Sequence, residues 1–170
     1  MARTIPLTQG YTTIVDDADY AALSVYRWKA LKAGKCVYAA RTVRSPGASH
    51  NDVTLLMHRV LFGTGAQRVD HINHDSLDNR RCNLRAATAS TNAANSPLIV
   101  RGTSRFKGVY WNKKDGKWQA QIGNGKAACK YLGQFDSEVE AASAYNAAAR
   151  QRFGQFAVLN SIPKREAQTA

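Results

Sequence analysis

The strongest chemical signal in the sequence is a pair of adjacent side chains, Asp70 and His71, at the end of a short apolar run. Two asparagines follow at fixed distances, Asn83 twelve and Asn92 twenty-one positions after His71. Carboxylate and amide oxygens are ligands that hard divalent cations prefer, and a neutral imidazole accepts a proton near neutral pH. The four side chains therefore predict a site that combines a cation with a general base.

Hydrolysis of a phosphodiester bond needs this combination, because it requires an activated water, neutralisation of charge on the phosphate and help for the departing oxygen. Asp70 and Asn92 are expected to bind one Mg²⁺ or Mn²⁺, since Mg²⁺ keeps several waters and needs few protein ligands. Alternation along a strand places His71 on the face opposite Asp70, so His71 is expected to act as the base rather than as a ligand. Asn83 is expected to hydrogen-bond the imidazole and hold its tautomer.

The chain also carries an excess of positive charge along its whole length. Its 170 residues hold 24 Lys and Arg against 12 Asp and Glu, for a net charge of +12 and a pI near 10.0. Residues 1–100 contain 12 basic and 7 acidic side chains, and residues 101–170 contain 12 and 5. An excess shared by both parts favours a polyanionic partner, most often a nucleic acid, over the alternative of a merely solvated basic surface.

Several classes of protein are disfavoured by the composition. With 44% hydrophobic residues and no long uncharged apolar run, neither a membrane span nor a membrane partner is expected. The opening residues lack the apolar stretch of a secretion signal. The isolated cysteines, Cys36, Cys82 and Cys129, fit neither a disulfide framework nor a zinc site. These features predict a protein of a reducing, intracellular setting such as the cytoplasm.

The residues before position 63 are expected to form short strands and two brief helices that support the site. The strands are expected at 5–7, 11–15, 28–31, 36–43 and 53–56, and the helices at 17–23 and 57–62. His58, in the second helix, is interpreted as a packed or capping histidine. The aromatic side chains are interpreted as a small core, with a base-stacking surface as the alternative; they are Tyr11, Tyr20, Tyr26, Trp28 and Tyr38.

The candidate site itself falls on a compact strand, loop, strand and helix. A unit of about thirty residues cannot bury a core alone, so it is expected to pack on the N-terminal strands. Its elements are a strand over 68–72, a polar loop over 73–82, a strand over 84–87 and a helix capped by Thr88 or Ser90 that runs to Asn95. Residues 96–103, which include Pro97 and Gly102, are expected to form a linker.

A second folding unit is expected over residues 104–160. Alternation and turn residues predict three antiparallel strands at 107–111, 117–122 and 128–135, and Ser137 with Glu140 forms a capping box at the start of a helix. Residues 161–170 are polar and expected to be a loose tail. The predicted fold class is therefore α+β, with a strand-rich N-terminal region packed on the site unit (about 57–95, within a domain 1–95), then a three-stranded sheet packed on one helix.

The first set of motifs resembles a known nuclease family. Asp70-His71-Ile72, residues 79–85 (Asn-Arg-Arg-Cys-Asn-Leu-Arg) and Asn92 are similar to the motif of the HNH nucleases. The similarity is greatest to phage and intron-encoded homing endonucleases, which use asparagine in place of the final histidine. The resemblance implies a ββα-metal unit, His71 as general base, Asp70 and Asn92 as ligands of one divalent metal, and Asn83 as the orienting asparagine. No structural zinc is expected, because this chain lacks the zinc-binding cysteine pairs of some relatives. The resemblance also implies the cytoplasm of a bacterial or phage-infected cell, and double-stranded DNA rather than a small molecule as the substrate. The arginines of the motif, Arg80, Arg81 and Arg85, are expected to contact DNA.

The second set resembles the Apetala/ethylene-response-factor DNA-binding domain. The resemblance is carried by residues 104–111 (Ser-Arg-Phe-Lys-Gly-Val-Tyr-Trp), 116–120, 132–135 and 140–148. In that family the three-stranded sheet enters the major groove, so the resemblance implies that the corresponding side chains face DNA: Arg105, Lys107, Tyr110, Lys117, Gln121, Lys130 and Tyr131. Tyr110 and Tyr131 stand where plant members usually carry arginine and tryptophan, so the base preference of those members does not transfer.

The sequence as a whole predicts a metal-dependent endonuclease of the HNH homing type that hydrolyses double-stranded DNA, by a nick or a double-strand break. The alternative is a non-catalytic, sequence-specific DNA-binding regulator with a vestigial nuclease unit. The intact set of Asp70, His71, Asn83 and Asn92 speaks against that alternative, because a base that is no longer used is usually the first residue to be lost. The other alternative, that these residues are an ordinary surface pair with turn and cap asparagines, would require four residue types to match the motif by chance. RNA binding is a weaker alternative, since the usual stacking motifs of RNA-binding folds are missing.

Overall fold

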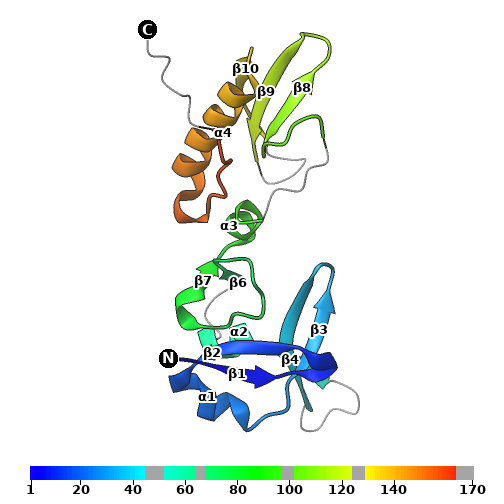
Figure 1. The fold of residues 1–170 in the computed structure, drawn as a ribbon, viewed down its shortest axis with the longest axis vertical. Coiled ribbons are helices and arrows are strands. Elements are labelled where there is room, and N and C mark those ends of the chain that lie inside the picture. Colours follow the sequence, from blue (N-terminus) through cyan, green and yellow to red (C-terminus); the bar gives the residue numbers. More distant parts are fainter. Residues whose placement is uncertain (45–51, 64–67, 97–101, 124–128, 164–170) are drawn as a thin grey trace. The chain divides into compact units, whose positions relative to one another are not determined.

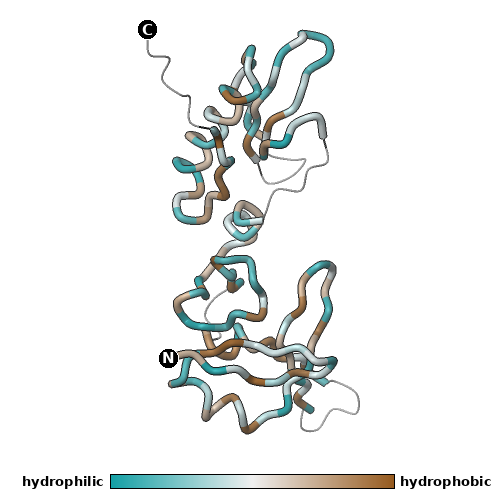
Figure 2. Tube along the Cα trace, viewed as in Figure 1, coloured by the Kyte–Doolittle hydropathy of each residue, from teal (hydrophilic) through white to brown (hydrophobic). Residues whose placement is uncertain are grey.

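A computed structural model describes residues 1–44, 52–63, 68–96, 102–123 and 129–163 (Figure 1). The fold is mixed α+β, with several small antiparallel sheets and few helices, as the sequence predicted. The chain divides into two compact units, Met1–Ala89 and Ser90–Ala170. Among the described residues, no helix is long and apolar enough to cross a membrane. Figure 2 shows hydrophobic residues distributed along the strands and helices of both units.

Among its described residues, the first unit contains three antiparallel sheets: β1 pairs with β2, β4 lies between β3 and β5, and β6 pairs with β7. Its elements are β1 (Ala2–Pro6), β2 (Thr12–Asp16), α1 (Asp17–Ser24), β3 (Lys29–Ala33), β4 (Cys36–Arg44), β5 (Asp52–Leu56), α2 (Met57–Phe62), β6 (Arg68–His71) and β7 (Leu84–Ala87). Short 3₁₀ turns cover Thr8–Gly10 and Arg81–Asn83. Each predicted element of this unit is present, with ends that differ by a few residues.

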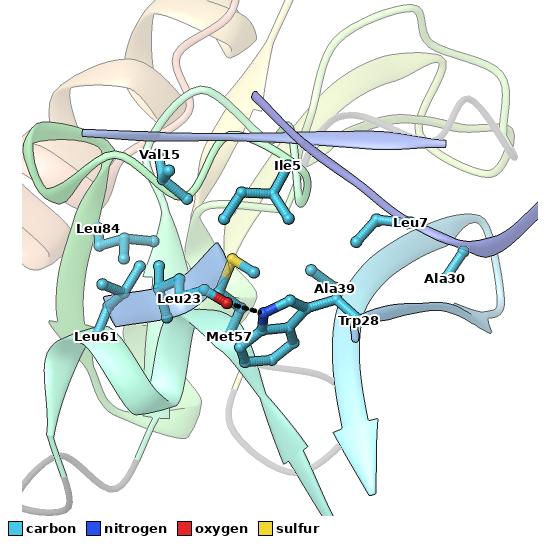
Figure 3. Packing of buried hydrophobic residues seen from close by; sticks show 10 residues of the cluster. All are labelled: Ile5, Leu7, Val15, Leu23, Trp28, Ala30, Ala39, Met57, Leu61 and Leu84. Atoms are coloured by element: carbon cyan, nitrogen blue, oxygen red, sulfur yellow. Dashed lines mark hydrogen bonds between the residues drawn. The ribbon is translucent and has the colours of Figure 1, made fainter. Parts of the chain in front are cut away.

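One hydrophobic core joins these elements (Figure 3). Met57 and Val15 are fully buried within it, and the indole nitrogen of Trp28 donates to the carbonyl of Leu23 over 2.9 Å. Leu84, at the start of β7, belongs to the same cluster. The hairpin that carries Asp70 and His71 is therefore fixed to the N-terminal strands, as its small size predicted.

The aromatic side chains of the first unit divide between several roles. Trp28 is buried, and Tyr11 and Tyr20 pack against the core from its edge. Tyr26, by contrast, is exposed beneath the guanidinium of Arg41, 3.8 Å from the ring centroid. The prediction of one aromatic core is therefore wrong for Tyr26. Tyr38 lies beside two histidines, as described below.

The second unit contains α3 (Ala89–Ala94, whose first residue closes the first unit), β8 (Val109–Asn112), β9 (Lys117–Ile122), β10 (Lys130–Phe135) and α4 (Glu138–Phe153). The strands form an antiparallel sheet in the order β10-β9-β8. The hydroxyl of Ser137 accepts from the backbone N–H of Val139, which starts α4 as the capping pattern predicted. Ala141, Ala142 and Ala149 are fully buried, so the helix lies close against the sheet.

Helix α3 packs within the second unit, whereas the sequence placed it in the first, ahead of a linker at 96–103. Ala94 belongs to a core cluster with Ile122, Tyr145 and Phe153. The ammonium of Lys107 also donates to the carbonyls of Ala94 and Ser96, both over 2.8 Å. The boundary therefore falls between Ala89 and Ser90. Residues 97–101 of the expected linker, and 164–170 of the expected tail, lie outside the described residues.

Candidate active site

Asp70 and His71 end strand β6, where it pairs with β7. Asp70 lies opposite Arg85 and His71 opposite Leu84 in the antiparallel register. Both functional side chains are buried, with exposed fractions of 7% and 8%. Because neighbours on a strand point to opposite faces, the hairpin holds the carboxylate and the imidazole next to each other along the chain but on different faces.

The carboxylate of Asp70 is paired with the guanidinium of Arg85. Nε and Nη2 of Arg85 lie 2.9 Å and 2.8 Å from the same oxygen, Oδ2. Both side chains are about nine-tenths buried. The predicted contact of Arg85 with DNA stays a prediction; in the structure Arg85 neutralises Asp70 across the hairpin. The ion pair therefore holds the Asp70 carboxylate against the neighbouring strand.

Asn83 organises the loop between the strands. Its Nδ2 donates to the carbonyl of Asp78 over 2.8 Å, and its Oδ1 accepts from the backbone N–H of Asn73 over 2.9 Å. Both ends of the Asn83 amide are thus engaged inside the loop, whereas the prediction placed this side chain at the imidazole.

Asn79 makes the contact that was predicted for Asn83. Its Oδ1 lies 3.3 Å from Nε2 of His71, and its Nδ2 donates to the hydroxyl of Thr13 over 2.7 Å. The loop is carried to this position by strand β2, since Ile14 N–H donates to Leu77 O and Asn79 N–H donates to Ile14 O, each over 2.8 Å. Sequence reasoning missed Thr13 because nothing in the motif marks a residue so far away in the chain.

Two further rings lie against the imidazole of His71. The ring of His58, from α2, lies 5.0 Å from it edge to face, and the ring of Tyr38, from β4, lies 6.4 Å away and 5.6 Å from His58. Burial, with smaller contributions from His71 and Arg59, lowers the pKa of His58 to about 4. The interpretation of His58 as a packed histidine is thus confirmed, and the structure adds that it packs on the candidate base.

Burial also lowers the pKa of His71, while the hydrogen bond with Asn79 and the nearby carboxylates of Asp70, Asp75 and Asp78 act in the opposite direction. A histidine with a lowered pKa is neutral at neutral pH, which is the form that accepts a proton. The ring is therefore ready to act as a base under ordinary conditions.

The other two arginines expected to contact DNA are also paired with carboxylates. Arg80 binds Asp78 through Nε and Nη2, over 2.7 Å and 2.6 Å. Arg81 binds both oxygens of Asp19 over 2.8 Å and donates to the carbonyl of Leu61 over 3.2 Å. These contacts attach the loop to α1 and α2, so both arginines have structural partners in addition to the role that the resemblance implies.

Asn92, the second expected metal ligand, lies half-buried on α3 and so belongs to the second unit. Within the described ranges, no group of three or more His, Cys, Asp or Glu side chains gathers as a metal site. The predicted donor set, one carboxylate and one amide, stays a prediction; such a set would suit a hard cation that keeps most of its waters. The buried carboxylate of Asp70 fits such an ion chemically.

One face of the sheet in the second unit carries four of the seven side chains expected to face DNA. The register pairs Tyr131 with Gln121 and Asn112 with Lys117, and alternation places these residues and Tyr110 opposite the face that packs on α4. Tyr131 is 55% exposed. Burial and the neighbouring Tyr131 raise the pKa of Tyr110. Lys117 is bound to Asp136 over 2.7 Å.

The other three side chains expected to face DNA differ in exposure. Arg105 and Lys130 are exposed, Arg105 beside the Phe106 ring and Lys130 on the edge strand β10. Lys107 is half-buried with its ammonium on the backbone at the end of α3, and burial lowers its pKa. The structure thus gives Lys107 a structural contact in place of an exposed position.

Comparison with known proteins gives partial matches to two kinds of protein. An uncharacterized HNH endonuclease of Acanthamoeba polyphaga mimivirus is 34% identical over 94 residues, which cover 55% of this chain and 47% of that protein. The APETALA2-like protein 2 of Oryza sativa is 49% identical over 67 residues, or 38% of this chain and 15% of that protein. The AP2-like ethylene-responsive transcription factor PLT2 of Arabidopsis thaliana is 47% identical over 62 residues, or 35% and 11%.

The chain thus spans less than half the length of each of these relatives. No family model and no solved structure matches it. The similarities extend to one protein named for an HNH endonuclease and to several named for APETALA2-like proteins, which are the two families that the motifs resembled.

Proposed function

We propose that this protein is a metal-dependent DNA endonuclease of the HNH homing type, which hydrolyses phosphodiester bonds in double-stranded DNA. The observation that carries the proposal is the buried pair Asp70 and His71, which are consecutive residues of strand β6. The imidazole of His71 is held by Asn79, and burial keeps it neutral. The chain's partial similarity to a protein named as an HNH endonuclease supports the same reading.

Each residue of the proposed site has its own role. His71 takes the proton of the attacking water, a role worth about 10² to 10⁴ in rate. Asp70 and Asn92 would hold one Mg²⁺ or Mn²⁺, which supplies charge neutralisation at the scissile phosphate when bound. Arg85 holds the Asp70 carboxylate in place through Oδ2. Asn83 keeps the loop closed so that Asn79 stays against the imidazole.

We propose that the second unit binds the DNA duplex. The sheet face with Tyr110, Gln121 and Tyr131 offers aromatic and amide groups, which can stack on or hydrogen-bond to bases. Arg105 and Lys130 are the exposed basic side chains that suit phosphate contacts. The partial similarity of the chain to APETALA2-like proteins, one of them named as a transcription factor, supports DNA rather than RNA as the partner.

The endonuclease proposal is tested by nicking of supercoiled plasmid with Mg²⁺, with and without a chelator. We expect cleavage that the chelator abolishes, and His71→Ala should lower its rate by about 10² or more because the general base is lost. His74→Asn is the matched control, since His74 is an exposed histidine of the same loop with φ 66°, a conformation that asparagine tolerates. Full activity in His71→Ala would remove His71 from the mechanism.

The second candidate is a DNA-binding regulator without catalytic activity. It is favoured by one observation, that the identity to APETALA2-like proteins is higher than the identity to the HNH-named protein. Duplex binding in a gel-shift assay together with no metal-dependent nicking would support the regulator and exclude the nuclease.

A further inference from the structure

The hydrogen bonds around Asn79 determine which nitrogen of His71 carries a proton. The hydroxyl oxygen of Thr13 lies 2.7 Å from the carbonyl oxygen of Leu77. Two oxygens at that distance require a hydrogen between them, and a carbonyl has none to give. The single hydroxyl proton of Thr13 is therefore committed to Leu77.

With its proton committed, Thr13 can only accept from Asn79. The amide group that lies 2.7 Å from the Thr13 hydroxyl must then be the NH₂ of Asn79, which turns the amide oxygen toward His71. That oxygen lies 3.3 Å from Nε2 of the imidazole. An amide oxygen only accepts, so Nε2 must carry the proton, and in the neutral ring Nδ1 then carries the lone pair.

We propose that Thr13 and Asn79 are positioning residues of the nuclease site, which hold His71 in its Nε2–H tautomer so that Nδ1 accepts the proton of the attacking water. The inference rests on the proposed function for the role of the base, and on the hydrogen bonds alone for the tautomer. In the step itself, the O–H bond of water breaks, its proton bonds to Nδ1, and the oxygen pair forms a bond to phosphorus. The P–O bond to the departing ester oxygen breaks, its electron pair leaves on that oxygen, and the oxygen then takes a proton from water.

Burial makes this arrangement rigid. Thr13 is 0% and Asn79 1% exposed, so water cannot replace either partner without opening the core. Strand β2 supplies both Thr13 and the backbone groups of Ile14 that hold the loop. The N-terminal strands thus set the chemistry of a motif that begins more than fifty residues later in the chain.

The test compares Thr13→Val with Thr13→Ser in the full-length protein. Valine keeps the shape but gives Asn79 no acceptor, whereas serine keeps the hydroxyl. The imidazole ¹⁵N chemical shifts of His71 are measured at pH 8 without metal or DNA, because protonated and lone-pair nitrogens give well-separated signals. We expect the wild type and Thr13→Ser to show protonated Nε2, and Thr13→Val to show a mixture of tautomers.

The rate of plasmid nicking should depend on how much of His71 is in the Nε2–H tautomer. Thr13→Val should lower kcat about tenfold or more with KM for DNA within about twofold, since general-base assistance is worth about 10² to 10⁴ and only part of it is lost. Thr13→Ser, which keeps the hydroxyl, should retain the kcat of the wild type. Asn79→Leu, which removes the acceptor for Nε2, should lower kcat in the same way.

Two results separate this inference from the proposed function. A wild-type protein that nicks DNA but carries its proton on Nδ1 would overturn the inference and leave the endonuclease intact. A wild-type protein with protonated Nε2 but no metal-dependent nicking would overturn the proposed function and, with it, the role of Nδ1 as base. Equal kcat in Thr13→Val and Thr13→Ser would remove Thr13 as a positioning residue.

Discussion

At the scale of single residues, the first unit keeps its polar side chains in defined pairs. Asp70 is bound to Arg85, Asn79 to Thr13, and Asn83 to the backbone of its own loop. Buried polar groups that lack partners are costly, so pairs of this kind hold one geometry. Such fixed geometry is what a catalytic base requires, because small displacements of a reacting group cost large factors in rate.

His58 gives a residue-scale prediction about stability and pH. Its pKa is lowered from 6.5 to about 4 in the folded state, so the unfolded state binds a proton more readily. The free energy of unfolding should therefore be highest above pH 6.5 and fall as the pH drops toward 4, by up to about 1.4 kcal/mol per pH unit from this group. Urea unfolding followed at a series of pH values measures the slope.

His58→Phe is the variant that isolates this contribution, because phenylalanine keeps a ring against His71 and does not titrate. Its unfolding free energy should fall less steeply between pH 6.5 and 4 than that of the wild type. The contribution of His71, whose pKa is also lowered, has the same sign and remains in both proteins. Identical slopes would mean that His58 is protonated in the folded protein at these pH values.

At the scale of elements, the second unit depends on a close approach between the sheet and helix α4. Gly108 has φ 74°, and a Cβ there would overlap the Tyr145 ring and lie 2.6 Å from the carbonyl oxygen of Gln121. That carbonyl sits on β9, whose Gln121 N–H donates to Gly108 O over 2.8 Å. The glycine thus lets the strand β8 begin directly against the helix.

Gly108→Ala is therefore expected to destabilise the second unit by about 3 kcal/mol or more, from overpacking together with strain at positive φ. Gly116→Ala is the control, because Gly116 has φ 61° and open space around its Cα. It should cost only about 1 kcal/mol, the strain alone. Thermal unfolding followed by the fluorescence of Trp111 and Trp118, which lie 5.1 Å apart in this unit, compares them. Equal losses would mean that the helix can move away at no cost.

At the scale of the whole molecule, the net charge of +12 is distributed unevenly between exposed and paired side chains. Arg80, Arg81 and Arg85 are bound to carboxylates, and Lys107 to backbone carbonyls. These groups have intramolecular partners to give up before they reach a phosphate. Arg105 and Lys130 are exposed, so we expect them to reach a phosphate at a lower energetic cost than the basic side chains that are held in these pairs.

Two lysines of the second unit make this difference measurable. We expect Lys130→Gln to weaken duplex binding and to reduce the slope of log K against log salt concentration by about 0.9, the value for one phosphate contact. Lys107→Met should leave the slope unchanged but lower the stability of the unit by about 1 to 3 kcal/mol, because two carbonyls lose a charged donor. A reduced slope for Lys107→Met would return Lys107 to the DNA contacts that its position in the family implies.

Local residue chemistry was sufficient to predict the hairpin elements, the capped start of α4 and the mixed α+β class, because turn residues, alternation and capping act over a few positions. The sequence also marked Asp70 and His71, whose types and adjacency are visible without a fold. It predicted helix α3 but assigned it to the first unit, because a six-residue helix has no periodicity that shows which core it packs against. In the structure, Ala94 and Lys107 attach α3 to the second unit.

Only the tertiary structure decided which asparagine reaches the imidazole. Spacing along the chain singled out Asn83, but the loop runs along β2 and presents Asn79 instead, with Thr13 behind it. It also decided which basic side chains are exposed, because ion pairs such as Arg81 with Asp19 join residues more than sixty positions apart. Sequence determines which groups are present and what they can do; long-range packing determines which of them meet.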